Sequence, residues 1–479
     1  MSKGKEYIKN TLILLLGKFA TQFMSFLLLP LYTSKLATDD FGTIDLIQTY
    51  LTLLVPVLTL RMDSATFRFL VDVRKSPEKT KSVISNVLFV LIWSVVLALL
   101  ISLIVSFFVI LPNYIWIIMN LIVLMISGVT LQILRGTGKI THYAIVSVIT
   151  GVSTLALNVI LIAFMGRGAD SILISSSIAN IICILFVFFS ARLYKNFSSS
   201  MISKKTIKEF LSFSIPMIPN ALSWWIVSVS DRTLIRIFLN AAANGIYSVS
   251  CKFSNTLYSV FSIFNISWQE SASLHINDKD RDEFFTKMIN QLLFFFSSIA
   301  LLILVAIPIF YNLLIGEQYR DSYNYIPVLL YANSWAILVS LIGGIYVAKK
   351  RTKAIANTTI ISAAINIVVD LILIHFIGVH AATISTLASC MAMGIYRVCD
   401  CQKYVKYKFD YKGFALFTII FITSAVMYHL DIMWLNIVNI LFVGIYVFLV
   451  NRNNMKSILS MLKFRKKSVN KTINETAGS

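Results

Sequence analysis

Five cationic side chains lie within or beside long apolar segments of this sequence: Lys18, Arg61, Arg68, Arg232 and Lys252. A charge inside an apolar helix is costly, on the order of 2.5–3.5 kcal/mol at the centre of a bilayer. A cation in such a place either extends to the membrane surface or faces a polar cavity. Lys18 stands ~10 Å into its apolar segment, and both interpretations remain open for it. The chemistry that these residues could do together is the binding of an anion.

Two acidic residues accompany the cations. Asp231 directly precedes Arg232, and it either pairs with that arginine at a helix end or belongs to the binding site. Asp370 lies deep in an apolar segment, where a carboxylate is protonated, paired or bound to a coupling ion. Arg61 and Arg232 can also be read as interfacial anchors, whereas Lys252 would have to extend toward the side where positive charge is disfavoured. The predicted substrate-binding residues are Lys18, Arg61, Arg68, Asp231, Arg232 and Lys252, and Asp370 is the candidate ion-coupling residue.

The composition is that of a polytopic membrane protein. The 479 residues are 57% hydrophobic and 13% charged, with a mean hydropathy of +0.80, whereas soluble domains are about 25% charged. The net charge of +20 lies in short loops and a tail between apolar segments, which is typical of membrane topology and not of nucleic-acid binding. The five cysteines form no disulfide framework, and no spacing predicts a metal site or a cofactor.

Fourteen apolar segments are long enough to cross a bilayer, so the sequence predicts an all-α fold. They are 11–31, 42–60, 84–110, 114–134, 143–165, 169–191, 208–230, 243–268, 288–313, 323–347, 354–377, 379–398, 412–429 and 432–450. With the N-terminus inside, the predicted cytoplasmic segments hold 35 Lys and Arg and the outer ones hold 5. This asymmetry places both termini in the cytoplasm and the protein in the cytoplasmic (inner) membrane.

The first six spans repeat as the next six. "NVILIAFMGRGADSI" (158–172) and "DLILIHFIGVHAATI" (370–384) are identical at seven of fifteen positions. Gly42 and Gly245 correspond at a slightly shorter offset. Because six spans return the chain to the same side, the repeat is parallel, and transporters of this kind hold their substrate between the two halves. The predicted units are a six-helix lobe at 1–192, a second at 206–398, two peripheral helices at 411–450 and a basic cytoplasmic tail at 451–479.

Several segments, in their order and spacing, carry a family resemblance. They are "LYTSKLATDDFGTIDL" (31–46), "RMDSATFRF" (61–69), "IPMIPNALSWWIVSVSDRTLI" (215–235), "NGIYSVSCKFS" (244–254) and "NIVVDLILIHFIGVHAATIST" (366–386). The chain resembles the multidrug/oligosaccharidyl-lipid/polysaccharide (MOP) exporter superfamily, and within it the Wzx-type flippases of the polysaccharide branch. The resemblance implies a V-shaped pair of bundles and a cargo of undecaprenyl-pyrophosphate-linked oligosaccharide for O-antigen, capsule or exopolysaccharide synthesis. It also implies a polysaccharide polymerase and a chain-length regulator as candidate partners.

Three other functions compete with this one. A membrane glycosyltransferase or polymerase would need catalytic groups on sizeable outer loops, and the predicted outer connections are short, so we expect no enzyme. A drug–cation antiporter of the same superfamily would need acids in its cleft, and here cations predominate. A lipid II flippase would share the anionic cargo, and it stays an alternative.

Overall fold

The computed structural model describes residues 24–108, 113–349 and 351–452, and these form an all-helical protein without strands. Eleven helices among the described residues are long and apolar enough to cross a membrane. Two further helices at predicted positions, α11 (Ile218–Phe238) and α12 (Ala241–His275), are as long but more polar. The predicted span at 11–31, with Lys18, lies outside the described residues, as does the tail from residue 453 onward.

The first half of the chain forms a helical bundle, here called the N-lobe. Its helices are α2 (Leu29–Lys35), α3 (Thr38–Leu58), α4 (Met62–Val73), α5 (Pro77–Phe108), α6 (Tyr114–Gly136), α7 (Ile140–Asn158) with its π-helical continuation (Val159–Phe164), and α8 (Asp170–Ser190). Shorter elements then lead to the second half: α9 (Leu193–Asn196), a 3-10 turn (Ser199–Met201) and α10 (Lys204–Ser214).

The second half, here called the C-lobe, consists of α11 and α12 followed by four more long helices. These are α13 (Arg281–Leu314), α14 (Ser322–Ala348), α15 (Thr352–Ile377) and α16 (His380–Cys401), with a 3-10 turn (Glu317–Tyr319) before α14. Two peripheral helices complete the described chain: α17 (Tyr411–Leu430) and a last helix at Met433–Arg452.

The seventh predicted span is displaced along the sequence. A single helix is predicted at 208–230, but the chain forms α10, a 3-10 turn at Ile215–Met217 and then α11, which ends at Phe238. Pro216 explains the break, since proline removes a backbone donor and clashes with the preceding turn, and Pro219 stands in the first turn of α11, where proline is tolerated. Asp231 and Arg232 therefore lie inside a helix instead of in an outer connection, and the connection from α11 to α12 is short.

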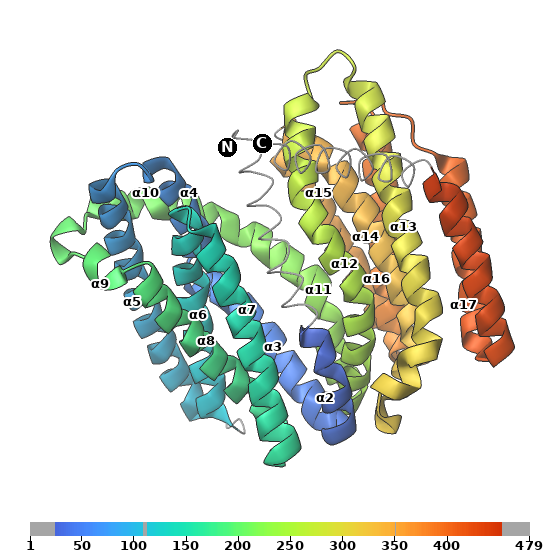
Figure 1. Cartoon of the computed structure of the whole chain (residues 1–479), viewed down its shortest axis with the longest axis horizontal. Coiled ribbons are helices and arrows are strands. Elements are labelled where there is room, and N and C mark those ends of the chain that lie inside the picture. The colour runs from blue at the N-terminus through green and yellow to red at the C-terminus, as the bar shows by residue number, and fades with distance from the viewer. Residues whose placement is uncertain (1–23, 109–112, 350, 453–479) are drawn as a thin grey trace, which may run out of the picture.

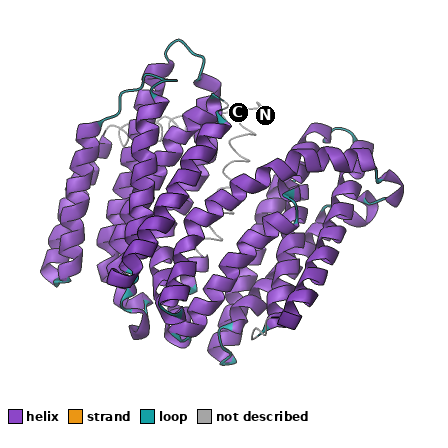
Figure 2. Ribbon diagram, turned by 180° about the vertical axis from the view of Figure 1, so that it is seen from behind, coloured by secondary structure: helices purple, strands orange, loops and turns teal. Residues whose placement is uncertain are grey.

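The two lobes approach each other at one end and diverge at the other (Figures 1 and 2). At the narrow end, here called the converging end, α2 and α3 of the N-lobe lie beside α12. At the wide end, α4 and α10 of one lobe are separated from the loop between α12 and α13 of the other. Helix α11 begins beside the N-lobe and crosses to pack on α15, so the described helices form a V.

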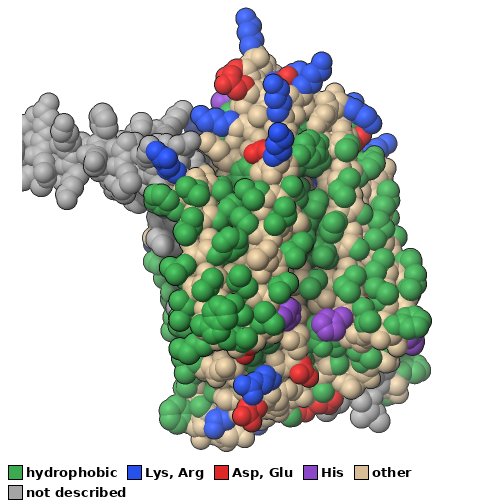
Figure 3. Space-filling model, turned by 90° about the vertical axis from the view of Figure 1, so that its right-hand side faces the viewer, with side chains coloured by type: hydrophobic (Ala, Val, Ile, Leu, Met, Phe, Trp, Pro, Cys, Tyr) green, Lys and Arg blue, Asp and Glu red, His purple; other side chains and the backbone are tan. Residues whose placement is uncertain are grey.

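The outer surface matches a lipid environment. Large hydrophobic side chains are exposed along the bundles, among them Trp93, Phe164 and Phe376, with 60%, 80% and 82% of their surface accessible. Figure 3 shows a broad hydrophobic band on the C-lobe side, with Lys and Arg gathered mainly at the wide end. An apolar girdle of this kind is stable in lipid and would be a liability in water. The protein is thus a multi-pass membrane protein.

The closest approach of the two lobes is a crossing of α3 and α12 at two glycines. A Cβ atom on Gly42 would lie 2.0 Å from the carbonyl oxygen of Ala241, and one on Gly245 would lie 2.2 Å from that of Thr38. Small residues permit backbones to pack this closely in membranes. The Asn244 amide also donates to the Gly42 carbonyl at 2.7 Å. The α3–α12 crossing therefore tolerates no side chain at either glycine while the lobes are in this arrangement.

Candidate functional site

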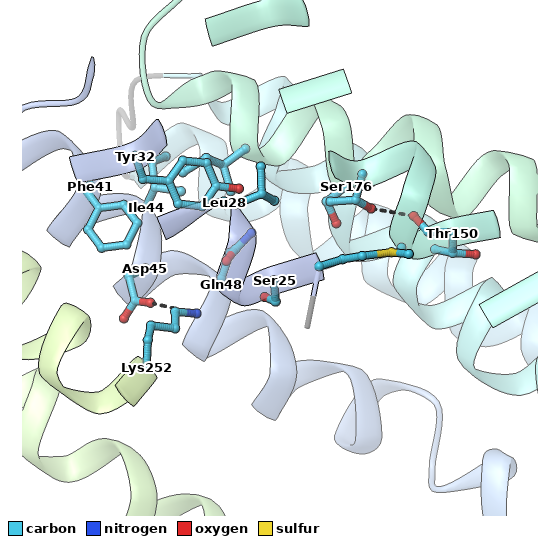
Figure 4. Close-up of a pocket in the computed structure, with 14 residues that line it drawn as sticks. Ser25, Leu28, Tyr32, Phe41, Ile44, Asp45, Gln48, Thr150, Ser176 and Lys252 are labelled. Atoms are coloured by element: carbon cyan, nitrogen blue, oxygen red, sulfur yellow. Dashed lines mark hydrogen bonds and ion pairs between the residues drawn. The ribbon is translucent and has the colours of Figure 1, made fainter. Parts of the chain in front are cut away.

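A cavity of about 270 Å³ has Asp45 of α3 and Lys252 of α12 in its wall (Figure 4). Its wall comes from the N-lobe helices α3, α7 and α8, from the residues preceding α3, and from α12, which contributes Lys252. Polar groups alternate with apolar ones along this wall. The polar lining residues are Ser25, Tyr32, Asp45, Gln48, Thr150, Thr154, Ser176 and Lys252. A cavity with hydroxyl, amide and charged groups beside apolar ones suits a ligand that has both polar and apolar portions.

Asp45 of α3 forms ion pairs that join the two lobes. Its Oδ2 atom lies 2.9 Å from Nε of Arg232 on α11 and accepts a 2.6 Å hydrogen bond from Ser248 Oγ. Lys252 Nζ approaches the other carboxylate oxygen at 4.0 Å. All three partners belong to the C-lobe, and the Asp45 side chain is only 7% exposed. A charge buried in this way is retained only when it is paired and hydrogen-bonded.

The two predicted cations at this site differ in exposure. The Arg232 side chain is 13% exposed, while that of Lys252 is 38% exposed and points along the cavity wall (Figure 4). Lys252 stands eleven residues after the start of α12, ~16 Å along the helix. The structure thus brings Arg232 and Lys252, two of the predicted substrate-binding residues, to a shared partner, Asp45.

Further interlobe contacts surround the crossing at the converging end. Tyr319 donates its hydroxyl hydrogen to the carbonyl of Leu36 at 3.0 Å, and the Gln318 amide donates to the same carbonyl at 2.9 Å. The backbone amide of Gly316 donates to Thr33 Oγ1 at 3.2 Å. These bonds join α2 and the start of α3 to the turn before α14, so the lobes are closed against each other here.

The Asp231 side chain points into the C-lobe, whereas the neighbouring Arg232 pairs with Asp45 on α3. Its carboxylate is 3% exposed and accepts hydrogen bonds from Tyr247 at 2.8 Å, Thr386 at 2.5 Å and Asn366 at 3.0 Å. Successive residues of a helix point about 100° apart, which lets Asp231 and Arg232 serve different sites. The predicted placement of Asp231 beside the substrate cations remains untested, although its described contacts are with hydroxyl and amide groups of the C-lobe.

Asp370 lies one helical turn after Asn366 on α15 and is completely buried. Neither of its carboxylate oxygens has a hydrogen-bond partner among the described residues. With the Asp231 cluster nearby, the C-lobe thus contains two buried carboxylates, one satisfied by neutral donors and one not. Such a pair is either protonated or accommodates a cation.

Arg61 and Arg68 lie at the wide end, far from the Asp45 cluster. Arg61 follows α3 in a left-handed backbone conformation, and sixteen residues of helix and turn separate it from Asp45, ~24 Å along α3. It donates to Ser64 and lies 3.4 Å from an oxygen of Asp63. Arg68 pairs with an acid on its own helix and is more than half exposed. Among the described residues, the predicted cations therefore lie in two groups at different depths of the molecule.

Sequence reasoning missed three kinds of residue. Asp45 was counted only as an acid within a span, because its cationic partners, Arg232 and Lys252, are far away along the chain. Asn366 stands four residues before Asp370, so the two lie on one face of a helix. This spacing of polar residues in an apolar span was the signal in the sequence for a buried polar cluster. The hydroxyl groups of the cavity wall, from Thr150 and Ser176, carry no distinguishing sequence pattern.

Comparison with known proteins gives the chain a family. The family model described as polysaccharide biosynthesis protein matches residues 7–269, more than half of the chain. The chain belongs to the polysaccharide biosynthesis protein family. Among curated protein sequences, none matches it significantly. The matched region of this polysaccharide biosynthesis protein includes Asp45, Arg232 and Lys252, here called the interlobe cluster. Asp370 lies beyond that region.

Solved structures share the fold of this polysaccharide biosynthesis protein. An inward-facing multidrug resistance MATE family transporter of the MOP superfamily has a TM-score of 0.65 at 12% identity, covering 80% of this chain and 95% of that one. The lipid II flippase MurJ in an inward closed conformation also has a TM-score of 0.65, at 15% identity, covering 94% and 100%. An outward-facing MATE family transporter has a TM-score of 0.54 at 11% identity, covering 83% and 95%. The expected superfamily fold is confirmed.

Proposed function

We propose that this protein is a flippase that moves undecaprenyl-pyrophosphate-linked oligosaccharide from the cytoplasmic to the outer leaflet of the cell membrane. The observation that carries the proposal is a polar cavity of the N-lobe that Lys252 of the C-lobe enters, with Arg232 paired to the cavity residue Asp45, in a polysaccharide biosynthesis protein. The cavity would receive the head group of the cargo, and the lipid chain would stay in the bilayer.

The charge balance of Asp45, Arg232 and Lys252, which meet at the edge of the cavity, favours an anionic cargo. Two cations face a single carboxylate, Asp45, so the cluster has an excess positive charge. A diphosphate carries about two negative charges near neutral pH and gains from each of the two cations. A cationic drug would meet this excess as a repulsion. Arg61 and Arg68 at the wide end would be earlier contacts for the same anion, and Lys18 completes the proposed set of cations.

We further propose that the structure represents the inward-facing state. The wide end carries the basic segments at 61–81 and 192–208, and such segments face the cytoplasm in membrane proteins. The converging end is then the outer side, and both termini are cytoplasmic. The better match to the inward-facing relative than to the outward-facing one, TM-scores of 0.65 and 0.54, supports this orientation.

The membrane potential is the proposed main driving force. Moving a negative charge outward is favoured by ~2.3 kcal/mol per charge per 100 mV when the cytoplasm is negative. The buried carboxylates Asp231 and Asp370 offer a second contribution, since a proton or a monovalent cation bound between them would couple the C-lobe to an ion gradient. Their neutral surroundings suit a singly charged ion better than a divalent one.

Transport by the purified protein in proteoliposomes is the direct test. Undecaprenyl-pyrophosphate-linked oligosaccharide with a fluorescent sugar is incorporated, and a membrane-impermeant quencher reports the fraction that reaches the other leaflet. Matched liposomes receive lipid II or a cationic dye in its place. The proposal predicts flipping of the oligosaccharide carrier and no dye transport.

The alternatives give different results in the same assay. Preferential movement of lipid II would identify a lipid II flippase, and transport of the dye against an ion gradient would identify an antiporter. In cells, we propose that the outer-leaflet product passes to a polysaccharide polymerase working with a chain-length regulator. Loss of the flippase would then leave unpolymerised repeat units attached to carrier lipid on the cytoplasmic side.

A further inference from the structure

Asp45 is the single carboxylate that three C-lobe donors share across the lobe interface. Ser248 donates to it at 2.6 Å, Arg232 lies 2.9 Å away and Lys252 lies 4.0 Å away. The acid lies on α3 in the N-lobe, whereas all three donors lie on the C-lobe helices α11 and α12. Charge pairing at this point therefore holds the two lobes together, and not merely one helix against its neighbour.

The α3–α12 crossing lies within one turn of this carboxylate. Gly42 precedes Asp45 by three residues, and Gly245 precedes Ser248 by three residues. The two pairs are thus neighbours on the same faces of the same two helices. Any change that draws the C-lobe cations away from Asp45 acts directly on the contact that closes the converging end.

We propose that Asp45 is an internal counterion that competes with the diphosphate of the cargo for Arg232 and Lys252. The proposal rests on the proposed function for the identity of the cargo. A diphosphate that enters the cavity pairs with the two cations in place of Asp45. Asp45 is then no longer held to the C-lobe by ion pairs. The closure at Gly42 and Gly245 is then weakened while the cargo is bound.

The difference in exposure of the two cations sets an order of events. Lys252 is 38% exposed and only loosely held by Asp45 at 4.0 Å, so it is the first cation that an anion in the cavity meets. Arg232 is 13% exposed and more tightly bound, so it exchanges afterwards. The Lys252 side chain thus receives the anion, and Arg232 carries the decisive link between the lobes.

The same exchange accounts for the return of the empty carrier. Once the diphosphate leaves from the outer side, two cations without an anion would be costly to return through a low-dielectric region. Asp45 restores one negative charge to them and at the same time draws α3 back onto α12. The counterion therefore lowers the cost of the reset and closes the converging end in one step.

Spin-label distances across the converging end test the proposal. Arg167→Cys on the N-lobe and Glu317→Cys on the C-lobe are exposed positions that receive the labels, in a Cys399→Ser background because Cys399 is exposed. The full chain is measured in nanodiscs by pulsed electron spin resonance. The probes are undecaprenyl pyrophosphate and, as the uncharged control, undecaprenol.

Three variants separate the counterion from other effects. Asp45→Asn removes the charge, and Asp39→Asn is the matched control, an exposed acid on the same helix. The double variant Asp45→Ser/Ser248→Asp keeps the net charge but moves the acid to the lobe that already holds the cations. Purification yield and elution as a single species verify folding for each.

The proposal expects a short label distance in the wild type, and a shift of at least threefold in population toward longer distances in Asp45→Asn without any probe. The double variant should open in the same way, because its acid no longer joins the lobes, whereas Asp39→Asn should match the wild type. Undecaprenyl pyrophosphate should open the wild type, and undecaprenol should not.

Two results would overturn the proposal. One is an Asp45→Asn protein whose distances equal those of the wild type. The other is a wild type that flips the oligosaccharide carrier in liposomes yet keeps its short distance when undecaprenyl pyrophosphate is bound. Failure of the proposed function looks different, since Asp45→Asn would still open but the wild type would flip no undecaprenyl-linked cargo.

Discussion

Replacing Gly245 by alanine should prevent the converging end from closing. A Cβ at this position would lie 2.2 Å from the Thr38 carbonyl oxygen, and the obstacle is backbone that cannot rotate away. Ordinary contact for a Cβ begins at about 3.4 Å, so α12 would have to withdraw from α3 by about 1.2 Å. Two helices joined to separate lobes can make that movement only by separating the lobes.

The size of the effect follows from the cost of overpacking. Inserting one methyl group into a close contact of this kind costs ~1–3 kcal/mol. Because the clash exists only in the closed arrangement, the whole cost falls on that state and reduces its population relative to the open one by about 5- to 150-fold. Gly42→Ala should act in the same direction, since its Cβ would lie 2.0 Å from the Ala241 carbonyl oxygen.

The assay combines the spin-label pair across the converging end with flipping in proteoliposomes. Gly245→Ala should show long distances with or without cargo and little flipping, although the protein inserts and purifies normally. Gly128→Ala is the control, because Gly128 is helical and a Cβ there would meet nothing within 4 Å. A Gly245→Ala protein that keeps the short distance and full transport would refute the view that this crossing closes the outer side.

Other predictions follow from the same structure. Lys252→Ala should lower flipping at least tenfold while Lys252→Arg keeps part of it, since the diphosphate needs the charge, and equal rates for all three proteins would mean that Lys252 is a surface anchor. Asp370→Asn should leave the dependence of flipping on membrane potential intact. Ion-coupled antiport would be favoured instead if the wild type ignored the potential but needed an ion gradient, and if Asp370→Asn flipped nothing. Reporter fusions should place Asp278 in the cytoplasm and Arg320 outside, and an external signal at Asp278 would invert the proposed orientation.

The long apolar helices were predictable because hydropathy and length determine them. Helix α14, for instance, was expected at 323–347 and runs from Ser322 to Ala348. The prediction was wrong for α11, since the charges at Asp231 and Arg232 were taken as the end of a span. Those charges are tolerated inside the helix because their partners come from α3, α12, α15 and α16. A hydropathy profile contains no information about such tertiary partners.

The candidate site was predictable only in part. Arg232 and Lys252 were selected as anion-binding candidates because they are cations within or beside apolar spans, and both lie at Asp45 in the structure. The role of Asp45 could not be read from the sequence, because it depends on which helices of the two lobes meet. The correspondence of Gly42 with Gly245 was visible as a repeat, but a repeat does not reveal that its equivalent residues touch each other.

That contact has the form of an interface between two copies of one protein. Gly42 packs against Ala241, and Gly245 packs against Thr38. Gly245 lies 203 residues after Gly42, and Ala241 lies 203 residues after Thr38, so each contact is the counterpart of the other. Such reciprocity is the property of an isologous dimer on a two-fold axis. By the same count Asp45 corresponds to Ser248, its own hydrogen-bond partner. In a dimer of identical chains an aspartate at this place would face its own copy and be repelled by it. Joining the halves in one chain allows one to keep the acid and the other to supply the donor, so the contact has a polarity that a symmetric assembly cannot have.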